Sequence, residues 1–498
     1  MNGYRMPAQI QGQWIWKNSL LKHPESFLLM RKEFVCTSVE LETNLWISAN
    51  CSYQLFINGR LVGFGPRAHQ NCGASYVDLH EVTYYLESGI NVIAVLVYHN
   101  IEQGGCNRHV PGLWCQMEAH GRVLLCSDQS WIIRDGSCFC GPRPRISRDR
   151  GKCHFFNAAN SPLNWITPVF LPDNDWMHPD HMTEVGEFGS RLELHPLPPA
   201  GVEVDSPSPV PFLRGKITGE PSWTQVVFEN AEDGMETYAA HTFLFCDADE
   251  VLPVQIFSDD AFKFFCNNRM VCSSDNAMGT ELGLPLRAGW NRLLLVQNPE
   301  RNSMGFVMLL PKNEKPEGGR ECWFSREPDK DASEGWRIVG PLKLSLEEAT
   351  PSLKFERLRS EPYVPELSHL TDPFAFLNAC QFEPETLPAD EKEATLAWSR
   401  PLRPGEYAVY KLDMIRYGTL RLTIDATEGD LVDITIGRRR TKAGFLSEGE
   451  GTRGTGTLRC RNAKNVYLTY TPADCFYIMT TLVSVSFSRF QVRRGGGL

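Results

Sequence analysis

The fold of this chain is decided by residues 45–68, which read LWISANCSYQLFINGRLVGFGPRA. The stretch predicts a strand, a turn and a second strand, because its side chains alternate at the two-residue period of strands. Asn58-Gly59 is the strongest short-range hairpin signal, since both central residues of a type I′ turn need a positive φ. Downstream, residues 91–97 (NVIAVLV) form an apolar run rich in β-branched residues, as expected of a buried strand.

The same pattern recurs later in the chain. Residues 261–271, AFKFFCNNRMV, follow the pattern of residues 52–62, SYQLFINGRLV, and stand 209 residues later. Residues 288–296, AGWNRLLLV, likewise follow residues 88–96, SGINVIAVL, at a distance of 200 residues. Because two separate segments match in the same order, the sequence favours two similar β-domains over a chance likeness between hairpins.

The length and net charge of the chain limit the classes of protein to which it can belong. A chain of 498 residues is too long for one hydrophobic core, so about three domains are expected. The net charge of −10 argues against a nucleic-acid partner, because phosphate binding needs a basic surface. The sequence shows neither an apolar run long enough for a bilayer nor a signal peptide, which predicts a cytoplasmic protein without a membrane partner.

The residues that could ligate metals do not form a recognisable site. The 16 cysteines are expected to be reduced thiols, and many of them lie in apolar strands. Cys138 and Cys140 are separated by one residue, which does not match a zinc knuckle. Residues 178–181 (HPDH) would need a helix to align their imidazoles, and Pro179 disfavours one. We therefore predict no metal and no cofactor.

A loop at residues 101–114, IEQGGCNRHVPGLW, holds the candidate binding residues of the first β-domain. An aromatic ring can stack on a sugar, while neighbouring polar side chains bond its hydroxyls, and loops on rigid sandwiches concentrate such residues. The candidate carbohydrate-binding residues are Asn107, Arg108, His109 and Trp114. The other interpretation is a solvated loop that is closed by a core tryptophan.

Paired acids precede the repeated hairpin. Asp259 and Asp260 could ligate calcium, which prefers carboxylate oxygens. Alternatively, they bond nearby backbone amides at the end of a strand, as aspartates often do.

Composition and periodicity also divide the chain into domains. Regular short strands with turns between them predict sandwiches or jelly rolls, whereas Pro- and Glu-rich stretches without periodicity predict connectors, with a short helix at 372–380. We expect an N-terminal β-sandwich at 1–165, a second jelly-roll domain at 166–345, a linker at 346–402, a third β-sandwich at 403–488 and a tail at 489–498.

Several strings together resemble one family. The N-terminal β-sandwich of bacterial α-L-rhamnosidases, glycoside hydrolase family 78, resembles this chain at residues 14–16 (WIW), 31–34 (RKEF), 47–66 and 129–131 (QSW). Residues 407–437 resemble the concanavalin-like sandwich of the same proteins, and the repeated hairpin is similar to their additional jelly rolls. The resemblance implies an all-β fold of tandem galactose-binding-like and concanavalin-like sandwiches.

The chain also departs from this family. Family members carry their chemistry in an (α/α)₆ barrel after the sandwiches, where acidic residues hydrolyse the glycosidic bond with inversion. We find no helical, acid-bearing region of that size before Leu498, so the catalytic barrel is expected to be missing or on a separate chain. An Arg-Tyr pair of the family is replaced by residues 475–477 (CFY), and a glycine is replaced by Met414.

Three hypotheses about function remain open. The first is a non-catalytic, carbohydrate-associated β-sandwich portion of a rhamnosidase-like protein, which binds a rhamnose-containing glycan or acts as a scaffold. The second is an active glycosidase that hydrolyses terminal α-L-rhamnosides at an unrecognised site between sandwiches; its acidic candidates would be Asp259, Asp260, Glu448 and Glu450, none of them a credible catalytic pair. The third is a fragment of a disrupted, truncated rhamnosidase gene.

Overall fold

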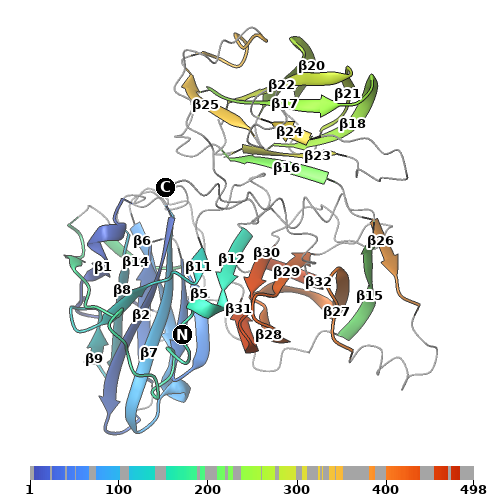
Figure 1. Ribbon diagram of the computed structural model, residues 1–498. Coiled ribbons are helices and arrows are strands. Elements are labelled where there is room, and N and C mark those ends of the chain that lie inside the picture. Colours follow the sequence, from blue (N-terminus) through green and yellow to red (C-terminus); the bar gives the residue numbers. More distant parts are fainter. Residues whose placement is uncertain are drawn as a thin grey trace. The chain divides into compact units, whose positions relative to one another are not determined.

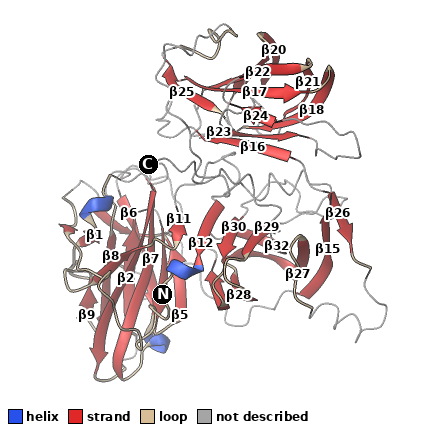
Figure 2. Ribbon diagram, viewed as in Figure 1, coloured by secondary structure: helices blue, strands red, loops and turns tan. Residues whose placement is uncertain are grey.

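The computed structural model describes most of the chain, and the described part is almost entirely β-structure (Figure 2). It contains three short 3-10 helices, Asn18–Leu20, Thr83–Tyr85 and Ala158–Asn160, and no α-helix among the described residues. The all-β prediction is confirmed. The helix expected at 372–380 and the tail at 489–498 lie outside the described residues. These are 5–22, 25–39, 42–50, 52–66, 74–100, 111–140, 153–187, 191–196, 210–218, 222–227, 237–258, 261–274, 280–298, 305–310, 323–325, 328, 336–342, 344–351, 381–386, 400–437, 454–468 and 473–482.

The chain divides into two compact units. The first comprises Met1–Pro142 and Asn157–Ser206, and the second comprises Arg143–Phe156 and Pro207–Leu498. The first unit thus takes in residues 166–206, which the sequence places in the second domain. The five segments that the sequence analysis expects remain predictions.

The first unit holds a β-sandwich of two sheets (Figure 1). Hydrophobic side chains alternate toward the space between the sheets, and Leu28, Leu55 and Val95 are among those buried there. One sheet has the order β13 (His181–Thr183), β1 (Trp14–Trp16), β8 (Leu113–Ala119), β3 (Asn44–Ala49), β6 (Ala74–Glu81) and β14 (Arg191–Leu194), with β9 (Arg122–Cys126) beside β8. The other has the order β10 (Ile132–Asp135), β2 (Glu25–Cys36), β7 (Gly89–Asn100), β4 (Ser52–Ile57) and β5 (Arg60–Gly65).

The second unit repeats this arrangement of strands. One sheet has the order β16 (Ser222–Val227), β23 (Gly305–Leu310), β18 (Glu250–Phe257) and β21 (Thr280–Leu286). The other has the order β20 (Arg269–Ser274), β19 (Phe262–Cys266), β22 (Gly289–Gln297) and β17 (Thr237–Cys246), with β24 (Trp323–Ser325) and β25 (Arg337–Leu342) beside β17. Taken in chain order, β16 to β23 therefore pair with one another as β1 to β8 do, and the repeat seen in the sequence is a repeat of topology.

The two hairpins of the repeat have the predicted turn conformation. Asn58 and Gly59 have φ values of 50° and 81°, and Asn267 and Asn268 have φ values of 48° and 65°. All four values are positive, as a type I′ turn requires. The type I′ prediction is confirmed in both copies.

A second asparagine closes the turn that leads into β7, and its equivalents recur twice. Asn91 accepts a hydrogen bond from the Glu87 amide (2.8 Å) and donates to the Glu87 carbonyl (2.7 Å). Asn291 makes the same pair of bonds with Arg287, at 2.9 and 2.7 Å. Asn465 makes them with Arg461, both at 3.0 Å. We call this side chain, which bonds both backbone groups four residues earlier, the asparagine latch.

The asparagine latch of Asn465 belongs to a third group of strands in the second unit. These strands form a sheet that includes, in order, β12 (Cys153–Asn157), β30 (Gly454–Arg459), β29 (Leu431–Gly437), β32 (Ala473–Leu482), β27 (Glu406–Gly418), β15 (Val210–Thr218) and β26 (Gln381–Pro384). A separate pair joins β28 (Arg421–Ala426) to β31 (Ala463–Leu468). The remaining short strand is β11 (Phe139–Cys140).

Candidate functional site

Only one residue of the predicted carbohydrate-binding set lies in the described part of the chain. Asn107, Arg108 and His109 lie outside the described residues, in the connection between β7 and β8. Trp114 lies in β8 and is fully buried, with its indole N–H donating to the Gln11 carbonyl at 3.0 Å. Its ring has no face open to a sugar, so the alternative of a core tryptophan that closes the loop describes its position.

The other predicted ligand residues are dispersed or undescribed. Asp259, Asp260, Glu448 and Glu450 lie outside the described residues. Among the residues that the structure describes, no group of three His, Cys, Asp or Glu side chains could hold a metal ion.

Residues 178–181 each have their own partners rather than a common centre. His178 Nδ1 lies 2.9 Å from the Trp131 carbonyl oxygen. The Asp180 carboxylate accepts a hydrogen bond of 2.7 Å from the backbone N–H of Asn18. These contacts tie the segment to the first sandwich.

A buried polar cluster lies between the two sheets of the first sandwich. Tyr53 projects from β4, whereas Asp78 and His80 project from β6, and all three are buried. The Tyr53 hydroxyl donates to Asp78 Oδ2 at 2.6 Å and lies 2.9 Å from His80 Nε2. The sequence analysis did not predict this cluster.

Two glycines of β5 make room for the polar cluster. A Cβ on Gly63 would lie 2.5 Å from His80 Cε1, and a Cβ on Gly65 would lie 2.0 Å from Asp78 Oδ2. Both distances are far shorter than a van der Waals contact. The alternate glycines in LVGFGP (61–66) are therefore the sequence signal of the cluster, since glycine in a strand often marks a close approach of other groups.

Burial and hydrogen bonding determine which atoms of the cluster carry protons. Burial lowers the pKa of His80 to about 4, so the imidazole is neutral at pH 7. The single hydroxyl proton of Tyr53 goes to Asp78, and the hydroxyl oxygen must then accept from His80. His80 is therefore the tautomer that carries its proton on Nε2.

The polar cluster lies at the same end of the sandwich as the predicted sugar-binding loop. Tyr53 pairs with Val97 in the adjacent strand, three residues before β7 ends at Asn100. The chain then enters the connection that contains residues 107–109. The cluster thus lies beside the point where the candidate loop leaves the sheet.

The second sandwich provides an internal comparison for the polar cluster. Phe262 pairs with Gln297 as Tyr53 pairs with Val97, so a phenyl ring replaces the phenol. The strand equivalent to β6 is β21, and Leu284 and Leu286 of this strand belong to the apolar core. The same topology therefore forms without the polar cluster.

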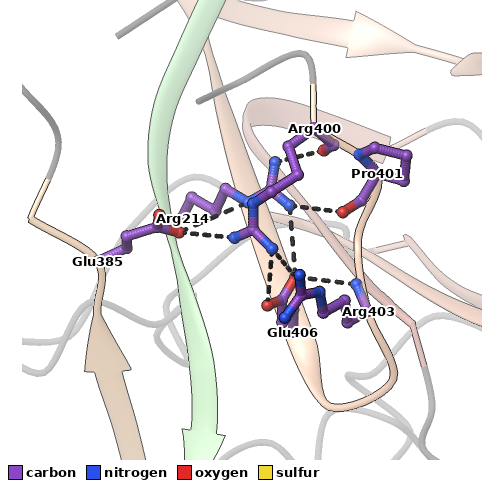
Figure 3. Close-up of polar contacts among 6 residues, drawn as sticks. All are labelled: Arg214, Glu385, Arg400, Pro401, Arg403 and Glu406. Atoms are coloured by element: carbon purple, nitrogen blue, oxygen red, sulfur yellow. Dashed lines mark hydrogen bonds and ion pairs between the residues drawn. The ribbon is translucent and has the colours of Figure 1, made fainter. Parts of the chain in front are cut away.

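A second polar network joins β15, β26 and β27 in the second unit (Figure 3). The buried Arg214 donates to the carbonyls of Arg400 (2.6 Å) and Pro401 (2.9 Å), and Glu406 Oε2 lies 3.3 Å from its Nη2. Arg400 bonds both oxygens of Glu406, at 3.1 and 3.2 Å, and its Nη2 reaches Glu385 at 3.0 Å.

The bonds around Glu406 make it a structural rather than a catalytic group. Burial alone would raise the pKa of Glu406, but donors from Arg403, Arg400 and Arg214 together hold that pKa below its ordinary value. The carboxylate is ionised and its acceptor positions are occupied. It is therefore unsuited to act as a general acid.

The fold and these clusters define the chain as an array of β-sandwiches with a preorganised polar end on the first. No family model and no curated protein matches it. Among solved structures, the glycoside hydrolase family 78 rhamnosidase of Bacillus sp. GL1 is similar over 95% of this chain, with 18% identity and a TM-score of 0.62. The chain spans 53% of the length of that rhamnosidase. An α-L-rhamnosidase from Dictyoglumus thermophilum is also similar, over 63% of this chain and 35% of its own, with 16% identity and a TM-score of 0.34.

The similarity to the Bacillus rhamnosidase shows a shared fold. It supports the resemblance to family 78 that the sequence strings suggest. Within the described ranges, no helix is long and apolar enough to cross a bilayer.

Proposed function

We propose that this chain is a carbohydrate-associated β-sandwich array of an α-L-rhamnosidase-like protein, and that it binds a glycan without cleaving it. The proposed binding residues are Asn107, Arg108 and His109, which follow β7 (Gly89–Asn100) in the chain. Asn107 and His109 bond sugar hydroxyls, and Arg108 supplies further donors.

The observation that carries this proposal is the polar cluster of Tyr53, Asp78 and His80. It lies beside the candidate loop, and the equivalent end of the second sandwich has Phe262 instead. A buried network of this kind holds the end of β4 and the end of β6 in one arrangement. The fold similarity to a family 78 rhamnosidase supports the proposal that the ligand is a carbohydrate.

The proposal is tested by calorimetric titration of the chain with L-rhamnose and with a rhamnose-containing oligosaccharide. We expect saturable binding that is lost when residues 107–109 are all replaced by alanine. The matched control replaces Arg301 and Asn302, which lie in the equivalent connection between β22 and β23, and should bind as the unaltered chain does. Equal binding by the 107–109 variant would place the glycan site elsewhere.

The same preparation separates binding from catalysis. Incubation with an aryl α-L-rhamnoside should release no rhamnose. Release that disappears in Asp260→Ala or Glu448→Ala would instead show an active glycosidase, and the non-catalytic proposal would be abandoned.

A further inference from the structure

The outer face of the β2–β7 sheet in the first sandwich is covered by an irregular segment, residues 161–176, which we call the strap. Its aromatic side chains attach it to the sheet. The ring of Trp165 lies 6.3 Å from that of Phe56 in β4 and 6.2 Å from that of Trp176 (centroid distances). Phe170 lies 5.6 Å from Trp176. One side of the strap is thus an aromatic layer packed on the sandwich.

A buried arginine holds the centre of the strap. The Arg31 guanidinium lies 5.0 Å from the Phe170 ring centroid, and its Nη1 donates to the Phe170 carbonyl at 3.2 Å. Two successive turns shape the backbone here, since Thr167 donates to the Asn164 carbonyl (2.9 Å) and Phe170 donates to the Thr167 carbonyl (3.3 Å). Prolines at 162, 168 and 172 restrict the chain further. The strap is therefore preformed.

The other side of the strap presents aliphatic side chains to solvent. Val169 and Leu171 are 79% and 87% exposed, and Leu163 is also more than half exposed. Val35 and Ile90, a cross-strand pair on the outer face of the same sheet, are more than half exposed as well. Single exposed aliphatics are ordinary, but three within nine residues of one segment favour an interaction surface.

The charged side chains of the strap and of the residues just after it are acidic. Residues 161–180 contain Asp173, Asp175 and Asp180 and no lysine or arginine. Arg134, from the neighbouring β10, is engaged by two of these acids, with contacts of 3.0 Å to Asp173 and 2.9 Å to Asp175. A partner whose apolar centre is rimmed by lysine or arginine complements this arrangement.

We propose that the strap, with Leu163, Val169 and Leu171 at its centre, is a docking surface for a protein partner whose apolar patch has a basic rim. A second copy of this acidic chain, with a net charge of −10, would be repelled through the same surface. Anionic lipid headgroups are repelled for the same reason. The proposal goes beyond glycan binding and uses different residues.

The test uses two synthetic helical peptides as probes, each with one leucine face, flanked by lysine in one peptide and by glutamate in the other. Fluorescence anisotropy measures their binding to the full chain. We expect the lysine peptide to bind and the glutamate peptide to bind at least tenfold more weakly. Added salt should lower the affinity of the chain for the lysine peptide, because salt screens the attraction between opposite charges. Val169→Ser with Leu171→Ser should weaken binding by roughly tenfold or more, because the variant removes two aliphatic side chains from the centre of the contact.

The matched control is Val251→Ser, which removes an aliphatic side chain of similar exposure (68%) from the second sandwich. It should leave the peptide affinity unchanged. Three results would overturn the proposal: no binding of the lysine peptide, equal binding by the strap variant, or equal binding of both peptides. Self-association in sedimentation that the strap variant abolishes would identify a second copy as the occupant and would also overturn it.

Discussion

His80 should make the first sandwich sensitive to acid. Its pKa in the folded chain is about 4, against an ordinary value of 6.5, because the imidazole is buried. As the pH falls below 6.5, the unfolded chain takes up a proton on this side chain and the folded chain does not. Stability is therefore present in full above pH 6.5 and is lost as the pH falls toward 4.

The size of this loss follows from the two pKa values. Each pKa unit corresponds to 1.36 kcal/mol, so the full effect is about 3 kcal/mol, of which about 2 kcal/mol is lost by pH 5. Other groups also titrate in this range, so the informative quantity is the difference between the unaltered chain and His80→Gln. Glutamine keeps a neutral N–H donor toward Tyr53 and has no proton to gain.

Two measurements check this prediction. Urea unfolding at pH 7 and pH 5 should show that His80→Gln loses about 2 kcal/mol less than the unaltered chain. NMR of ¹³C-histidine-labelled protein, with the His80 signal assigned by its absence in the variant, should show no titration of that signal above pH 5. Titration of the signal near pH 6.5, or the same pH dependence in both proteins, would refute the reasoning.

Three further changes test the packing of both units by thermal unfolding. Gly65→Ala should destabilise the first sandwich by about 2 kcal/mol or more, because the new Cβ overlaps the buried carboxylate; an unchanged melting temperature would contradict this. Tyr53→Phe should destabilise by about 1–3 kcal/mol by leaving polar groups unpaired. Phe262→Tyr should not stabilise the second sandwich, because the strand equivalent to β6 there presents Leu284 and Leu286 to the core. Glu406→Gln should destabilise the second unit by about 3 kcal/mol, because the buried Arg214 loses a charged partner. A loss below about 1 kcal/mol would show that Glu385, the other carboxylate near Arg214, is enough to compensate its charge.

The hairpins of this fold could be predicted from the sequence because their signal is local. Asn58 and Gly59 are residue types that tolerate a positive φ, and both have one. The repeated hairpin has asparagine at both equivalent positions, 267 and 268, and these also have positive φ values. Alternation within the strands likewise identified the all-β class. Neither inference required knowledge of which strands are neighbours.

The polar cluster could not be predicted in the same way. Tyr53 and Asp78 are 25 residues apart and lie on different sheets, so their contact depends on how the sheets face each other. Alternation placed Asp78 and His80 on one face of a strand but could not say that this face points inward. Trp114 shows the converse difficulty, since its place after a loop suggested exposure, whereas the register of β8 buries it.

The asparagine latch has a consequence for how the chain folds. Each latch closes over four residues, at Asn91, Asn291 and Asn465. Loops this short close within nanoseconds, long before strands that are distant in sequence can meet. Each group of strands thus carries its own early turn, and none must wait for another to set its register. We therefore expect the two sandwiches to mature separately and in chain order, and the third group to mature last, because its β15 and β27 flank the second sandwich in the sequence.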